Sequence, residues 1–246
     1  AFMTCSADNT VRVWTLAPVD SSASGQKKWK NAYSRELARV IYINSATGEE
    51  DLDYASDVGF SSHVDTERLP KPDWPCVPRA LACHPNRRQL AVGDKQGNLR
   101  IYDLISMELV DIVAAHDAEV LTLDYSPPMG SQPPQPAMPT YQHAQQLSEG
   151  SGDPPVVMLA SGSRDRLVHV YDASKSHKLH TTLDNHTSSV TSVRFSLDGK
   201  RLLSTGGDRT LVFSHVDNKA VLRYKSVKVA QGTVYGMAMD PAGKYV

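Results

Sequence analysis

The sequence has 246 residues, of which 40% are hydrophobic, and its 26 lysines and arginines nearly balance its 27 aspartates and glutamates. This balance argues against an overall electrostatic attraction to nucleic acid or to an anionic membrane. The cysteines (Cys5, Cys76 and Cys83) lack the number and spacing of a disulfide framework or a paired metal-ligand motif. With no signal peptide and no long apolar run, we expect a soluble chain from a reducing compartment.

Four segments of the chain resemble one another. Residues 2–14, 90–103, 159–172 and 202–214 each begin with apolar residues, pass through small residues and a turn, and end in alternating apolar residues. The turn residues and the period of two predict two antiparallel strands joined by a tight turn in each segment. We assign the glycines of these segments, including Gly93, Gly97 and Gly162, to strand turns and not to a phosphate-binding loop.

Further strands are predicted around these hairpins. Residues 116–126 and 186–196 each read as a polar loop with a histidine followed by a buried strand, and residues 78–85 and 234–241 repeat the strand without the histidine. The weaker outer strands are 37–43, 108–114, 179–183 and 221–225. Four strands per unit is the blade of a β-propeller, and the spacing from Asp165 to Asp208 lies within the about 40–45 residues of a WD repeat.

The recurrent pattern resembles the WD-repeat family, which is named after a Trp-Asp pair at the end of the third strand. That place holds Trp14-Thr15, Tyr102-Asp103, Tyr171-Asp172 and Ser214-His215 here. The resemblance implies an all-β WD-repeat propeller, with about four blades visible, two of them incomplete. We divide the chain into residues 1–76 (the end of one blade, an outer strand and a long insertion), 77–114, 115–183 and 184–228 (three blades), and 229–246 (the start of the next).

The family resemblance also implies a buried polar network in each blade, which joins a loop histidine, a strand serine or threonine, a turn aspartate and a third-strand aromatic residue. One blade offers His116, Ser161, Asp165 and Tyr171 for these places, and the next offers His186, Ser204 and Asp208, with Ser214 in place of the aromatic ring. Asp8 and Trp14 are the corresponding candidates in the first blade. Gln96 occupies the place of the aspartate in the second blade.

A closer resemblance concerns the mitogen-activated-protein-kinase-binding protein 1 family, which includes a spindle-pole WD-repeat paralogue. It rests on residues 5–14, 93–104, 115–126 and 160–170, above all on Ser-Arg-Asp-Arg-Leu and His-Asp-Ala-Glu-Val in the family's order. Members are long proteins with a double array of blades and a mostly disordered tail. We therefore expect further blades before residue 1 and after residue 246.

Two insertions interrupt the repeats. Residues 44–75 read as a surface loop. Residues 128–154 belong to a stretch rich in proline, glutamine and serine that cannot bury enough apolar surface to fold alone, so we expect a mobile loop. It is either an elaboration without a role or a docking segment with Tyr141 and Leu147 as its apolar anchors.

The sequence offers little for catalysis or for cofactor and metal binding. His116, Ser161 and Asp165 could form a hydrolase triad, but no elbow or oxyanion motif accompanies them. His177 and His180 read as surface histidines without a third metal ligand. The kinase-docking pattern at residues 87–92, like the weaker one at 200–203, falls on an expected buried strand. Lys27, Lys28 and Lys30 around Trp29 read as a solvated loop.

These observations predict a non-catalytic scaffold that binds other proteins, without a small-molecule substrate, a nucleic-acid partner or a membrane. The family resemblance implies a role in MAP-kinase signalling or in spindle and centrosome organisation, with kinases or microtubule-associated proteins as partners. One alternative is a structural component of a microtubule-based assembly such as a cilium, axoneme or basal body, and another is an enzyme. The expected location is the cytoplasm, in association with the cytoskeleton.

Overall fold

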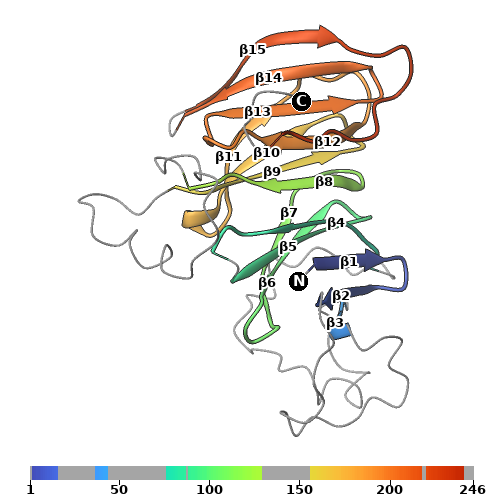
Figure 1. Cartoon of the computed structure of the whole chain (residues 1–246), viewed down its shortest axis with the longest axis vertical. Helices are drawn as coiled ribbons and strands as arrows, with labels where there is room; N and C mark the ends of the chain where they lie inside the picture. The colour runs from blue at the N-terminus through green and yellow to red at the C-terminus, as the bar shows by residue number, and fades with distance from the viewer. Residues whose placement is uncertain are drawn as a thin grey trace, which may run out of the picture.

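The computed structural model describes residues 2–15, 37–43, 76–86, 88–128, 156–217 and 220–240. These residues form the strands β1 to β15 and one short 3-10 helix, η4 (Ala173–Lys175). The strands make antiparallel sheets that follow one another in chain order along the long axis of the molecule (Figure 1). The predicted all-β class is confirmed, and no helix of the described residues is long and apolar enough to cross a membrane.

Each sheet is an up-and-down meander in which strands adjacent in sequence are hydrogen-bonded. The first sheet contains β1 (Phe2–Ser6), β2 (Thr10–Trp14) and β3 (Leu37–Tyr42), and the second contains β4 (Pro78–Cys83), β5 (Gln89–Asp94), β6 (Asn98–Asp103) and β7 (Leu109–Ala114). The third contains β8 (Val120–Tyr125), β9 (Met158–Ser163), β10 (Val168–Asp172) and β11 (Lys178–Leu183). The fourth contains β12 (Val190–Phe195), β13 (Arg201–Gly206), β14 (Thr210–Val216) and β15 (Val221–Lys228). The predicted hairpins and outer strands are therefore present.

The hydrophobic core lies in layers between successive sheets. Leu90 and Val92 of β5 pack with Val11 of β2, whereas Leu99 and Ile101 of β6 pack with residues of the third sheet. A further cluster joins the third and fourth sheets. This sandwiching explains why β5, β6, β9 and β10 are buried on both faces.

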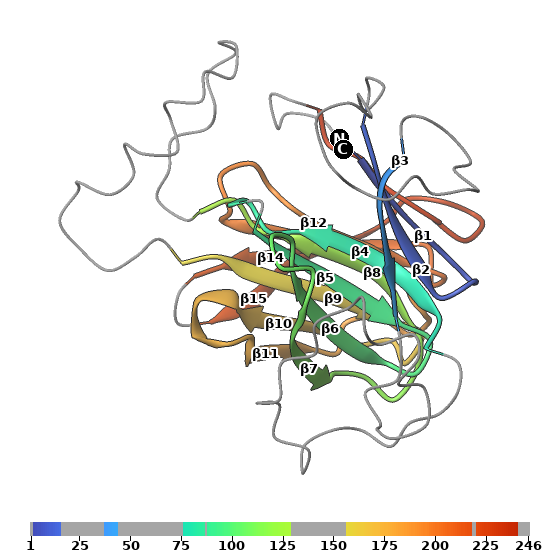
Figure 2. The same ribbon diagram turned by 90° about the horizontal axis from the view of Figure 1, so that it is seen from below.

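Successive sheets contact one another through their first strands, β4 with β8 and β8 with β12, which lie side by side (Figure 2). Two side chains of β8 add hydrogen bonds across this contact. The Thr122 hydroxyl accepts a bond from the Val193 N–H at 3.1 Å, and the Asp124 carboxylate accepts one from the Phe195 N–H at 2.7 Å. The sheets therefore form a continuous curved array, as in a propeller.

Of the predicted turn glycines, two lie inside strands instead, and a third, Gly206, is the last residue of β13. Gly93 is in β5 and Gly162 is in β9, and a Cβ atom there would lie 2.5 Å from Val120 Cγ1 and 2.6 Å from Val190 Cγ1, respectively. These glycines let the first strand of the next sheet approach. Gly97 does occupy a turn, with a φ angle of 95°, a conformation that favours glycine.

The strand predicted at residues 234–241 is absent: residues 234–240 form no strand. Val234 donates from its N–H to the Gly206 carbonyl at 3.5 Å, and its own carbonyl accepts from the Thr191 hydroxyl. A strand requires a ladder of such bonds to a neighbouring strand, and the described residues contain none for this segment. Most of both insertions, with Tyr141 and Leu147, and the lysines around Trp29 lie outside the described residues.

Candidate functional site

The predicted polar residues of the third sheet meet at the turn between β9 and β10. The His116 ring lies between Asp165, at 2.8 Å from Nδ1, and Ser161, at 2.7 Å from Nε2. Asp165 also accepts backbone bonds from Asp117 at 3.2 Å and from Leu167 at 2.9 Å. The fourth predicted member, Tyr171, is hydrogen-bonded to Ser161. This hydrogen-bond network thus connects the loop before β8 to strand β9, to the turn between β9 and β10, and to strand β10.

The electrostatics of this cluster fix its protonation state. Burial, followed by repulsion from His169, lowers the pKa of His116 to about 4. Burial alone would raise the pKa of Asp165, but backbone hydrogen bonds and the neighbouring His116 outweigh it, so that this pKa is lowered. A neutral ring donates from Nδ1 to the carboxylate and accepts at Nε2 from the Ser161 hydroxyl. Burial raises the pKa of Tyr171, which therefore keeps its proton.

The fourth sheet repeats this geometry at its own turn. His186 Nδ1 lies 2.9 Å from Asp208, and its Nε2 lies 2.8 Å from Ser204. Asp208 accepts from the Thr187 N–H at 3.0 Å and the Thr210 N–H at 3.1 Å. Burial alone would raise the pKa of Asp208, but the hydrogen bond from the Thr210 hydroxyl, together with these backbone bonds and that of His186, outweighs it and lowers that pKa. Ser214, which stands in place of the aromatic residue, is buried.

The first sheet holds part of the same arrangement. The indole N–H of Trp14 donates to the Thr4 hydroxyl at 2.9 Å across β1 and β2. Asp8 in the turn accepts from the Thr10 N–H at 3.1 Å and is paired with Arg12 at 2.6 Å. The hydrogen bond from the Thr10 hydroxyl, followed by those from the Arg12 side chain and the Thr10 N–H, lowers the pKa of Asp8.

In the second sheet, the corresponding turn is stabilised by residues that are not among the predicted ones. The Asp94 carboxylate accepts from the backbone N–H groups of Gln96 at 2.9 Å and Asn98 at 2.8 Å. Its other oxygen pairs with Arg100 at 3.2 Å, and this ion pair is almost fully buried. Arg100 also donates to the Cys76 sulfur at 3.0 Å, while burial raises the pKa of that thiol. Asp94, two residues before Gln96, thus supplies the carboxylate of this turn.

His116, Asp165 and His169 also satisfy the distance requirement of a metal site, because their ligand atoms lie within 4.8 Å of one another. Both nitrogens of His116 are engaged in hydrogen bonds, and His169 Nδ1 is bonded to Thr182 at 2.9 Å. A metal ion would have to displace these bonds, so the cluster is satisfied by its own hydrogen bonds.

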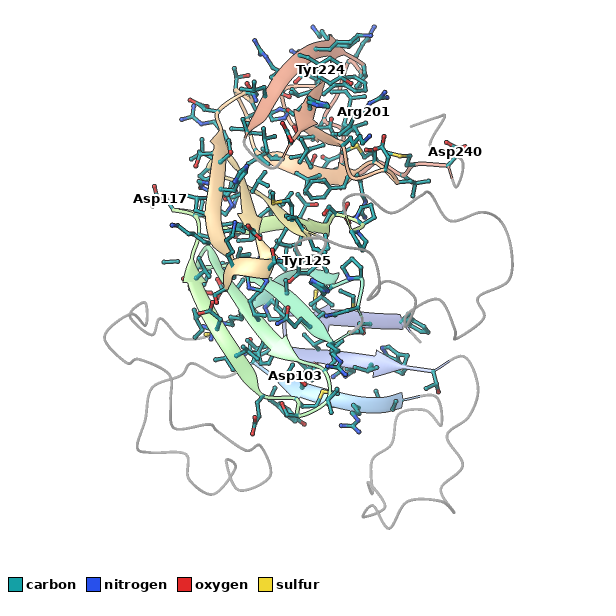
Figure 3. All side chains as sticks on the ribbon, turned by 90° about the vertical axis from the view of Figure 1, so that its left-hand side faces the viewer. Asp103, Asp117, Tyr125, Arg201, Tyr224 and Asp240 are labelled. Carbon is teal, nitrogen blue, oxygen red and sulfur yellow. The ribbon has the colours of Figure 1, made fainter. Side chains whose placement is uncertain are left out.

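His177, which we predicted to be a surface residue, is buried, and that prediction was wrong. Its Nε2 lies 3.0 Å from the Tyr125 hydroxyl. Tyr125 lies in the middle of the array (Figure 3), and burial lowers the pKa of His177. The kinase-docking pattern falls on a buried strand as predicted, since Leu90, Ala91 and Val92 of β5 are 0% exposed.

The comparisons with known proteins agree with this architecture. The family model described as "WD domain, G-beta repeat" matches residues 177–213. A chain of the Mitotic Checkpoint Complex crystal structure, 22% identical, has a TM-score of 0.51 over 70% of this chain and 43% of that chain, which shows the fold alone.

Two longer relatives match the whole chain. WD repeat-containing protein 62 of Mus musculus is 34% identical over 252 residues, and mitogen-activated protein kinase-binding protein 1 of Homo sapiens is 34% identical over 251 residues. The chain spans 14% of the length of each of these relatives. The chain therefore contains a WD repeat and has the β-propeller fold, and it is similar along its whole length to WD repeat-containing protein 62 and mitogen-activated protein kinase-binding protein 1.

Proposed function

We propose that this chain is part of a non-catalytic scaffold that binds other proteins. The observation that carries the proposal is the repetition of the His–Ser–Asp geometry in two consecutive sheets. A catalytic triad is a single constellation beside a substrate site, whereas a group that recurs at equivalent turns is a structural unit of the repeat. In this proposal the polar networks stabilise the blades, through His116, Ser161, Asp165 and their counterparts. Partner proteins bind on the surface of the propeller.

We further propose that the scaffold serves MAP-kinase signalling or spindle and centrosome organisation, in the cytoplasm and in association with the cytoskeleton. The support is the similarity to a relative whose name states that it binds a mitogen-activated protein kinase. The partners in this proposal are kinases or microtubule-associated proteins.

The test is proximity labelling and pull-down with the full-length protein, in wild type and in a variant lacking residues 128–154. A variant lacking residues 44–75 provides the matched control, because it removes the other predicted insertion. Enrichment of mitogen-activated protein kinases by the wild type would support the signalling scaffold. Recovery of tubulin or axonemal proteins that is lost only on deletion of residues 128–154 would favour a lattice component instead. If no protein is enriched above background, the proposed scaffold function is overturned.

A further inference from the structure

The outer edge of the fourth sheet differs from the other described outer edges. β15 is the longest described strand, and of its residues only Val221 is buried. The corresponding strand β7 is largely half-buried and β11 is exposed at three of its six residues, and each of these strands is followed by a further described sheet, whereas β15 is not. β15 lies at one end of the array (Figure 1), and Tyr224 marks the same end in Figure 3.

This edge is basic as well as apolar. Arg223, Lys225 and Lys228 provide its charges, and β15 has no acidic residue, whereas β7 contains Asp111. Leu222 and Tyr224 are 67% and 55% exposed. The Lys225 ammonium lies 5.7 Å from the centre of the Phe213 ring on the neighbouring strand. None of the ion pairs found among the described residues involves these three cations.

The described part of the chain leaves this edge uncovered. After β15 the chain turns back toward β12, where Val234 is bonded to Thr191 and Gly206. Contacts between neighbouring sheets run mainly through first and second strands, such as β4 with β8 and β12 with β9. A neighbouring blade packed in this way covers a face of the fourth sheet and leaves the outer backbone groups of β15 open.

We infer that the outer edge of β15 binds an extended, acidic segment of a partner protein by strand addition. Natural edge strands often carry lysines because like charges prevent two such edges from pairing. The same charges attract a strand that carries carboxylates, and the backbone groups of β15 then supply a ladder of hydrogen bonds. The apolar side chains of Leu222 and Tyr224 favour a segment in which acidic and apolar residues alternate. This inference rests on the proposed scaffold function and names the surface and the partner chemistry.

The test uses the full-length protein and a fluorescein-labelled peptide of about eight alternating glutamate and valine residues, the length of a typical strand. Fluorescence anisotropy measures its binding. Arg223→Glu combined with Lys225→Glu should weaken binding by about tenfold or more and should instead bind a peptide of alternating lysine and valine. Lys178→Glu on β11 is the matched control and should leave binding of the acidic peptide unchanged.

A second peptide separates strand addition from simple charge attraction. Methylation of alternate backbone nitrogens removes hydrogen-bond donors without changing the charge, so we expect about tenfold weaker binding. Equal binding of the methylated peptide, or an unchanged affinity in the Arg223→Glu, Lys225→Glu variant, would overturn the inference. Circular dichroism checks that the variant remains folded. If the peptide fails to bind but proximity labelling still recovers partners, the inference about β15 fails and the scaffold function stands.

Discussion

His116 and His186 occupy equivalent positions in consecutive sheets, but one neighbour differs. The residue opposite Ser161 on the adjacent strand is His169, whereas the residue opposite Ser204 is Val212. The His169 ring lies 4.3 Å from the His116 ring, measured between centroids. The two networks therefore share their hydrogen bonds and differ in their electrostatic surroundings.

Removal of the central histidine should destabilise the third sheet. His116→Ala leaves the carboxylate of Asp165 and the hydroxyl of Ser161 without their shared partner, and we expect a loss of about 3 kcal/mol in the free energy of unfolding. His215→Ala removes an exposed histidine and should change the free energy of unfolding by less than about 0.5 kcal/mol. Urea unfolding measures both. Equal stability of the two variants would contradict the structural role.

The lowered pKa of His116 makes the fold sensitive to acid. The unfolded chain takes up a proton near pH 6.5 and the folded chain only near pH 4, so the contribution to stability is complete above pH 6.5 and is lost as the pH falls toward 4. His169→Val removes the repulsion and should raise the pKa of His116. That variant should lose less stability than the wild type between pH 7 and 4.5, as measured by thermal unfolding. An equal loss would show that His169 does not influence His116.

At the scale of single elements, the second hairpin depends on a buried ion pair. Asp94→Asn or Arg100→Leu leaves one buried charge without its partner, and we expect each to cost about 3–5 kcal/mol. The double variant should cost less than the sum of the two, because both charges are then removed. Chemical denaturation of the four proteins gives the coupling energy. Additive losses would show that Asp94 and Arg100 act independently.

The close approach of the third and fourth sheets depends on Gly162. A Cβ atom there would lie 2.6 Å from Val190 Cγ1 and 2.8 Å from Thr122 Cγ2, so Gly162→Ala should force the strands apart and destabilise the fold by about 1–3 kcal/mol. Gly236→Ala is the matched control, since no atom lies within 4 Å of a Cβ at that position. Thermal unfolding compares the two. A neutral Gly162→Ala would mean that the sheets can separate at little cost.

At the scale of the whole molecule, the hairpin of β8 and β9 is closed by its own hydrogen bonds. The Ser126 N–H donates to the Met158 carbonyl at 2.8 Å, and the Met158 N–H donates to the Ser126 hydroxyl at 2.9 Å. The strand ends on either side of residues 128–154 are therefore adjacent, and a short turn can join them.

Replacement of residues 128–154 by a short glycine-rich turn should leave the fold intact. Shortening a loop changes the closure entropy only weakly, so we expect the midpoint of thermal unfolding to change by less than about 3 °C. Ser126→Ala provides the comparison, because it removes a bond at the base of the hairpin and should cost about 1 kcal/mol. A large drop on replacement alone would show that the insertion supports the array.

The strands and hairpins were predictable because their signals are local. Alternation of period two marks β2, β6 and β10, and the small residues between them mark the turns. The partners of His116 and His186 could be named only because the resemblance to the WD-repeat family supplied their roles. The resemblance did not identify the carboxylate of Asp94, because this residue lies two positions before the expected aspartate and pairs with Arg100.

The sequence by itself determined the all-β class, the repeat and the order of the hairpins, because each depends on residues close together in the chain. The tertiary structure decided the burial of His177 under Tyr125, the approach of Val190 to Gly162 and the ion pair that replaces the network in the second sheet. It also decided that β15 is an exposed basic strand among the described residues, while residues 234–240 form no strand. These features depend on which strands and sheets are neighbours, and hydrogen bonds, burial and charge pairing between distant residues fix that arrangement.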